Sequence, residues 1–227
     1  MKATSVIAGV VGGALLASVA AASPLQSMDM ELVHSGAEGN SYRLYANLDA
    51  GARIDAVYGN SVATLSIAAA EGLSFYQNSA GGNTSQAINS AFFMFVPAME
   101  WDSYVSIGAL YQNGDPFGGN NLNDIGIDWS NFAAGGALET DNGSWFVTPE
   151  DPQGSELGGR VFLGQFTVAG GTGVGYEDVV GSVNLQGKDA DGNTWTETGA
   201  TWAPIPAPGA LALLGLAGIA GSRRRRA

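Results

Sequence analysis

The sequence predicts an all-β protein in which residues 23–203 form a single antiparallel β-sandwich of jelly-roll-like type. Three observations predict this class. Apolar and polar residues alternate with a period of two in several short segments, turns rich in Asn, Asp and Gly separate them, and no long segment has helical periodicity. Because 34 Gly and 8 Pro in 227 residues stay below low-complexity levels, a packed core is allowed.

The clearest predicted strand covers residues 42–48. There Tyr42, Leu44, Ala46 and Leu48 would face the core, while Arg43, Tyr45 and Asn47 would face away from it. Similar alternation predicts strands at residues 64–67 and 104–109, and another at residues 160–169 in which Phe162, Phe166 and Val168 share one face.

Two other segments have a different pattern. The continuous apolar run at residues 91–96 predicts a strand buried on both faces, and residues 85–90 predict a short helical turn. Turn residues occur at 112–115, 141–144 and 189–193, and the last of these would join residues 179–187 to 194–202 as a C-terminal hairpin. About nine or ten short strands result, with no internal repeat and no second domain.

The charge and residue-type composition excludes several functional classes. The chain has 21 acidic and 9 basic side chains, a formal net charge of −12, so nucleic acid is not an expected partner. With no Cys and one His, it cannot form disulfides, thiolate metal sites or multi-histidine metal sites. All the carboxylates lie between Asp29 and Glu197, where only four bases occur, which gives this region a net charge of −17.

The N-terminal residues 1–22 have the pattern of a secretory signal peptide. Lys2 precedes an apolar stretch, and the small residues Ala20 and Ala22 precede a cleavage point that we place after Ala22. Signal peptidase is therefore an expected partner, and the chain is expected to be exported.

The C-terminal residues 204–227 have three parts: a proline-rich start, an uncharged apolar run at residues 210–222 and the basic cluster Arg223, Arg224, Arg225 and Arg226. The 19 residues from Pro204 to Ser222 are near the lower length limit for a transmembrane helix, although the proline-rich start shortens the continuous helical part. By the positive-inside rule the arginines stay cytoplasmic, so residues 23–203 would lie outside the inner membrane.

This tail resembles the PEP-CTERM sorting signal, with Pro206, Ala207 and Pro208 in the place of the usual Pro-Glu-Pro. The resemblance implies an exosortase-like sorting enzyme as a partner and a Gram-negative-type bacterium that makes extracellular polysaccharide, in which the protein reaches the cell surface or the extracellular matrix. The alternative is a membrane anchor that is never cleaved. Residues 101–108, 125–128 and 143–149 are similar to uncharacterised secreted β-domains of such proteins, which implies no activity.

Two groups of residues are candidates for ligand binding. Asp189, Asp191 and Asn193 place three oxygen-bearing side chains in one turn, as calcium loops do, although a simple Asp-Gly hairpin turn also explains them. No other cofactor is expected. Trp195 and Trp202 could form an aromatic platform for sugar rings, or they could be core residues.

Catalytic patterns are sparse. Glu100 and Asp102 could share a strand face as a glycosidase or lyase carboxylate pair, but such pairs arise by accident among 21 carboxylates. A Ser-His-Asp hydrolase would have to use His34, but the sequence contains no Gly-x-Ser-x-Gly motif. We therefore expect His34 to be an ordinary surface residue. We therefore expect a non-enzymatic structural or interaction protein of the cell surface, with a carbohydrate-binding, calcium-assisted module as the alternative.

Overall fold

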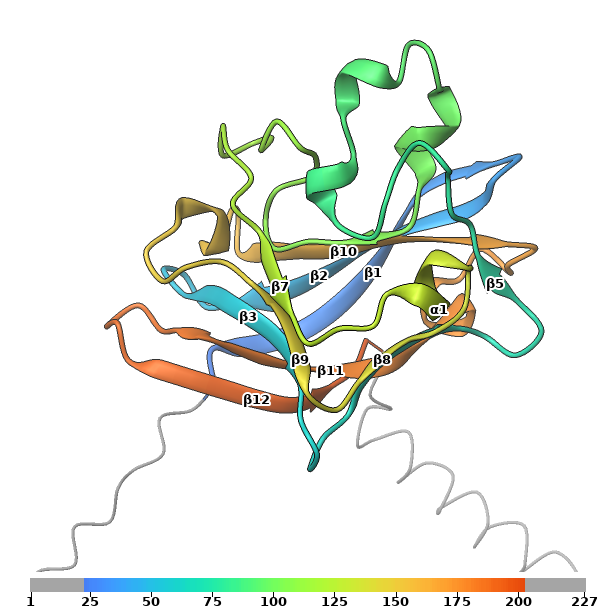
Figure 1. Cartoon of the computed structure of the whole chain (residues 1–227). Helices are drawn as coiled ribbons and strands as arrows, with labels where there is room; N and C mark the ends of the chain where they lie inside the picture. Colours follow the sequence, from blue (N-terminus) through green and yellow to red (C-terminus); the bar gives the residue numbers. More distant parts are fainter. Residues whose placement is uncertain (1–22, 203–227) are drawn as a thin grey trace, which may run out of the picture.

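The computed structural model describes residues 23–202 and shows a mostly β protein with two antiparallel sheets (Figure 1). The first sheet has the order β1 (Leu25–Gly36), β2 (Gly39–Leu48), β10 (Arg160–Ala169) and β5 (Ser74–Phe75), with β6 (Tyr104–Val105) also paired to β10. The second has the order β7 (Asn123–Ile125), β9 (Gly143–Phe146), β3 (Arg53–Gly59), β11 (Val179–Lys188), β4 (Leu65–Ala69) and β8 (Leu138–Thr140), with β12 (Thr194–Ala200) paired to β11.

Helical structure in the described residues is limited to short turns. They are α1 (Ser130–Ala133), α2 (Gly175–Asp178), and the 3₁₀ turns η1 (Ser85–Ala87), η2 (Ser90–Phe92), η3 (Pro97–Trp101) and η4 (Pro152–Gly154). The prediction of antiparallel β-structure with few helices is confirmed, and η1 falls within the predicted helical turn. Among residues 23–202, no helix has the length and apolar character needed to cross a membrane.

The larger hydrophobic cluster lies where the two sheets face each other. The alternation in β2 is confirmed, because Tyr42, Leu44, Ala46 and Leu48 are all buried in this cluster. The second sheet contributes residues from several strands, including Ile54, Val57, Trp145 and Leu185. Since the hydrophobic effect rewards removing these faces from water, the cluster holds the sheets together.

A smaller cluster lies on the opposite face of the first sheet. It contains Tyr45, Ile88, Met99, Tyr104 and Phe162, and it is covered by the segment between β5 and β7. In Figure 1 this green segment rises above β10, on the side away from the second sheet. The first sheet is therefore buried on both faces over part of its area.

A β-bulge in β10 changes which residues face each cluster. The pairing of β10 with β2 shifts register between Phe162 and Gly164, so Leu163 and Phe166 both face the larger cluster while Phe162 joins the smaller one. The prediction that Phe162 shares a face with Phe166 and Val168 was wrong for this reason. A Cβ at Gly164 would lie 2.8 Å from the carbonyl oxygen of Tyr104, which leaves room there only for glycine.

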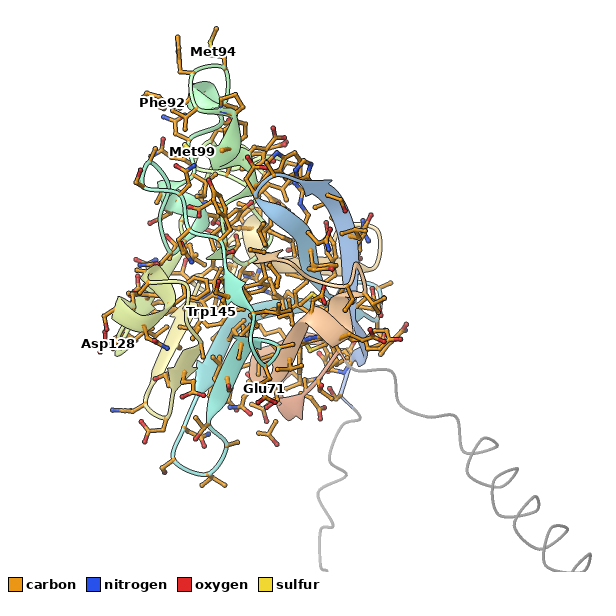
Figure 2. The ribbon with its side chains drawn as sticks, turned by 90° about the vertical axis from the view of Figure 1, so that its right-hand side faces the viewer. Glu71, Phe92, Met94, Met99, Asp128 and Trp145 are labelled. Atoms are coloured by element: carbon orange, nitrogen blue, oxygen red, sulfur yellow. The ribbon has the colours of Figure 1, made fainter. Side chains whose placement is uncertain are left out.

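The apolar run at residues 91–96 is not a buried strand, so that prediction was also wrong. Its first two residues belong to η2, and the next three form a turn at the end of the segment between β5 and β7, which we name the outer segment. Phe92, Met94 and Phe95 are exposed there. Figure 2 shows Phe92 and Met94 at the far end of the molecule, beyond Met99. Residues 104–109 likewise form a strand only at Tyr104 and Val105, and all six are buried.

The C-terminal hairpin is confirmed. Strands β11 and β12 pair across the turn at residues 189–193, with Lys188 opposite Thr194. The turn at residues 141–144 connects β8 to β9, which pair with β4 and β3 respectively.

Candidate ligand-binding cleft

A cleft of about 190 Å³ opens on the outer face of the first sheet, between β2, β10 and two loops. Its walls combine aromatic and aliphatic side chains with one cation. The lining residues are Tyr45, Gly108, Leu110, Pro116, Phe117, Ser155, Leu157, Arg160 and Phe162. The volume is below the ~300–1,000 Å³ of drug-sized pockets, so the cleft suits a single ring.

The floor of the cleft comes from neighbouring strands. Tyr45 of β2 pairs with Phe162 of β10 in the sheet, and their ring centroids are 5.7 Å apart at an interplanar angle of 54°. Both side chains belong to the smaller cluster and are almost fully buried. The floor is therefore fixed by sheet pairing and by the bulge that turns Phe162 outward.

Arg160 supplies the positive charge at the edge of the cleft. Its guanidinium lies 4.0 Å from the centroid of the Tyr45 ring, and its Nη1 is 3.0 Å from a carboxylate oxygen of Glu31. The side chain remains 47% exposed, so it can still donate hydrogen bonds to a ligand. Two other cations of the domain already have partners within the protein. Arg43 donates hydrogen bonds to Gln165 and Tyr111, and Arg53 donates one to Asp55.

The loop wall is held by buried polar contacts. Gln153 is fully buried and accepts the backbone N–H of Asn121 at 2.8 Å, while its own amide lies 3.2 Å from the Asn120 side-chain oxygen. Gly108 packs so closely that a Cβ would lie 1.9 Å from the Gln153 carbonyl oxygen, and its φ of +70° also favours glycine. The wall is therefore preorganised.

The predicted carboxylate pair does not form a catalytic pair on a strand. Glu100 lies in η3, and the Asp102 side chain is fully buried, where it accepts backbone N–H groups from Asn78, Gly82 and Ser103 at 2.7 to 3.0 Å. Burial raises the pKa of Asp102 to about 6, against the opposing effect of these three hydrogen bonds. The Asp102 carboxylate therefore connects residues 78–82 to residues 102–103. Neither Glu100 nor Asp102 lines the cleft.

His34 is near the end of β1 and stacks on the Trp101 ring with centroids 3.9 Å apart and planes 5° apart. Its Nε2 is 3.6 Å from a carboxylate oxygen of Glu38. The imidazole packs the β1–β2 hairpin against η3.

The two tryptophans predicted as a sugar platform are core residues. Trp195 and Trp202 are 5% and 4% exposed and belong to the larger cluster, so neither presents a ring face to a ligand. The Trp202 indole also donates a hydrogen bond to the Val179 carbonyl oxygen at 2.6 Å. Trp195 belongs to β12, and Trp202 lies two residues after the end of that strand.

The turn at residues 189–193 is closed by its own hydrogen bonds. The carboxylate of Asp189 accepts backbone N–H groups from Asp191 and Asn193 and the side-chain amide of Asn193, at 2.8 to 3.0 Å. The side-chain bond from Asn193 is the main reason that the pKa of Asp189 lies below its usual value. In residues 23–202 no three His, Asp or Glu side chains form a metal-binding group. Calcium binding stays a prediction.

A second hollow of about 360 Å³ lies beside β7 and β9. It is more open than the cleft, and its lining carries no charged side chain: Tyr58, Gly59, Ile125, Gly126, Asn142, Gly143 and Ser144. The cleft at Tyr45 and Arg160 offers more specific chemistry.

The processing residues Ala20, Ala22, Pro206, Ala207, Pro208, Arg223, Arg224, Arg225 and Arg226 lie outside the described residues. The predictions made for them stay predictions.

Comparisons with known proteins give no match: no family model, no curated protein and no solved structure is significantly similar to this chain.

The cleft was not predicted from the sequence. Its floor comes from positions more than a hundred residues apart, and only the pairing of β2 with β10 brings Tyr45 and Phe162 together.

Proposed function

We propose that this chain is an exported, non-catalytic interaction protein of the cell surface or extracellular matrix that binds a polysaccharide at the Tyr45–Phe162 cleft. The observation that carries the proposal is the combination, in one small cleft, of the half-exposed Arg160 with apolar side chains that stay at least partly open to solvent, Pro116, Phe117 and Leu157. Sugar rings have apolar C–H faces that pack on aromatic groups and hydroxyl oxygens that accept hydrogen bonds from arginine.

A neutral polysaccharide is the favoured ligand class. The net charge of −17 on residues 23–203 repels polyanions at low ionic strength, and one arginine paired with Glu31 does not offset it. The lining that the described residues provide contains no Asp, Glu or His, which supports binding without hydrolysis.

The proposal includes export through the N-terminal signal peptide, sorting of residues 204–227 by an exosortase-like enzyme, and association with the inner membrane before release or permanently. It also includes the finer fold assignment: because both sheets contribute to the larger cluster, we classify the domain as one β-sandwich of jelly-roll-like type.

The intact mass of the mature protein from the native cell tests the proposed processing of both termini. Residues 1–22 still present would contradict export by this route.

The binding experiment uses residues 23–203, which contain every strand pair and both clusters of the described structure. Calorimetric titration with neutral glucans, galactans and mannans and with a polyuronate should give saturable binding to a neutral chain. Arg160→Ala should weaken binding about five- to tenfold, the loss expected for one hydrogen bond.

The matched control is Lys188→Ala, which makes the same charge change on the second sheet and should bind as the parent protein does. Equal weakening by both variants would assign the effect to overall charge. No binding to any chain, or release of reducing sugar, would contradict the proposal.

A further inference from the structure

The most exposed apolar side chains of the outer segment form a projecting group that we name the apolar tip: Phe92, Met94 and Phe95. Their exposed fractions are 51%, 78% and 72%. Figure 2 shows Phe92 and Met94 at the extremity of the molecule, away from the sheets and from Trp145 in the core. Large apolar groups gathered at such a position mark an interaction site.

The tip is built rather than loose. Phe93 and Val96 point inward onto the smaller cluster, and the Phe93 ring contacts Tyr111 edge-on with centroids 5.2 Å apart. The backbone N–H groups of Phe95 and Val96 both donate to the Phe92 carbonyl oxygen, at 2.9 and 2.8 Å. Because Phe93 and Val96 are packed against the smaller cluster, the turn keeps the side chains of Phe92, Met94 and Phe95 exposed to solvent.

The charge pattern around the tip is unusual for this chain. Residues 72–99 contain no Asp, Glu, Lys or Arg, although residues 23–203 carry 21 carboxylates and four bases. The tip is therefore an uncharged projection on a strongly acidic domain, with no basic side chain of its own segment to attract an anionic surface.

The area and shape of the tip decide between occupants. Each large side chain can bury ~150–250 Å² at most, so three fall short of the ~800 Å² per partner of a stable protein interface. A convex projection also needs a matching concavity in a protein partner. A lipid interface is deformable and needs neither a large flat area nor a pocket.

We propose that the apolar tip inserts Phe92, Met94 and Phe95 into the interfacial region of a lipid bilayer with zwitterionic headgroups. The absence of charge in residues 72–99 matches a net-neutral surface, and the acidic body disfavours anionic lipid. This property is independent of the polysaccharide cleft, since none of the three side chains lines it.

The test uses residues 23–203, so that the C-terminal apolar run does not itself bind lipid. Because the chain contains no cysteine, Met94→Cys provides a single site for a polarity-sensitive fluorophore. Phosphatidylcholine vesicles should shift its emission to the blue. The matched control is Val62→Cys, at a 94% exposed position between β3 and β4, where no shift should occur.

A flotation assay measures binding itself. The triple variant Phe92→Ser, Met94→Ser, Phe95→Ser should bind phosphatidylcholine vesicles at least about tenfold more weakly than the parent, with an unchanged thermal unfolding midpoint because the side chains are exposed. Vesicles with half phosphatidylglycerol should bind less protein at low salt, and added salt should restore the binding.

Several results would overturn the proposal: no flotation of the parent protein, no spectral shift at position 94, equal flotation of the triple variant, or stronger binding to anionic vesicles. Concentration-dependent dimers that require the tip, without flotation, would assign it to a second copy instead. If the triple variant fails to fold, the labelled Met94→Cys protein decides alone.

Discussion

Single carboxylates fix the loops of this domain more than ion pairs do. Asp102 receives three backbone N–H groups, and Asp178 receives the N–H groups of Thr172 and Gly173 together with the Tyr42 hydroxyl. Burial raises the pKa of Asp178, but these hydrogen bonds outweigh it, so its pKa lies below the usual value. For Asp102 burial dominates and the pKa is raised to about 6.

The raised pKa of Asp102 predicts a pH-dependent stability. The folded state binds this proton more tightly than the unfolded state, so the contribution is present below pH 4 and is lost as the pH rises through about 6. Asp102→Asn cannot ionise. Relative to the parent protein, its free energy of unfolding should therefore improve by up to about 3 kcal/mol between pH 4 and pH 7.

Guanidinium unfolding of both proteins at each pH measures this difference, in which the other carboxylates cancel. Asp178→Asn is the opposite control: the folded-state pKa of Asp178 is lowered, so its stabilisation is lost as the pH falls. Parallel pH profiles for Asp102→Asn and the parent would show that burial does not perturb this carboxyl.

Among the elements, β10 connects the two clusters, because its bulge turns Phe162 toward the cleft and Phe166 toward the larger cluster. Gly164→Ala would place a Cβ 2.8 Å from the Tyr104 carbonyl oxygen and 3.1 Å from the Phe166 ring. We expect a loss of about 1–3 kcal/mol in the free energy of unfolding, as for other overpacked sites.

Urea unfolding of Gly164→Ala beside Gly119→Ala checks this expectation. A Cβ at Gly119 would meet no atom within 4 Å, so that control should change stability by less than about 0.5 kcal/mol. Similar losses in the two variants would mean that packing at the bulge is not the cause.

Elements with regular alternation were predictable from the sequence, and those shaped by long-range contacts were not. The pattern at Tyr42 to Leu48 and the β11–β12 hairpin depend on local periodicity and turn residues. The run around Met94 has no alternation, so nothing local shows that it lies outside. Phe162 changes face because of one bulge, and the Arg160–Tyr45 contact needs sheet pairing across more than a hundred residues.

For the whole molecule, the dominant electrostatic property is self-repulsion. A net charge of −17 on residues 23–203 destabilises the compact state, and salt screens this repulsion with a Debye length of about 10 Å at 0.1 M. The thermal unfolding midpoint should therefore rise by several degrees as sodium chloride increases from about 0.01 to 0.5 M.

Differential scanning calorimetry measures this dependence. The double variant Glu71→Gln, Asp141→Asn removes two exposed carboxylates and should show a smaller rise with salt. A midpoint that falls with salt would indicate that attractive ion pairs dominate.

Calcium chloride at matched ionic strength tests the predicted cation site at residues 189–193. A further rise in the unfolding midpoint that is lost in Asp189→Ala would support this site.

The terminal strand of the first sheet gives this charge a second role. Strand β1 ends the sheet order, and its exposed positions include Asp29 and Glu31. Carboxylates along an edge strand oppose pairing with the same edge of another molecule. Protonation of these carboxylates should remove that protection, so we expect edge-to-edge association of this twelve-residue strand to increase as the pH falls.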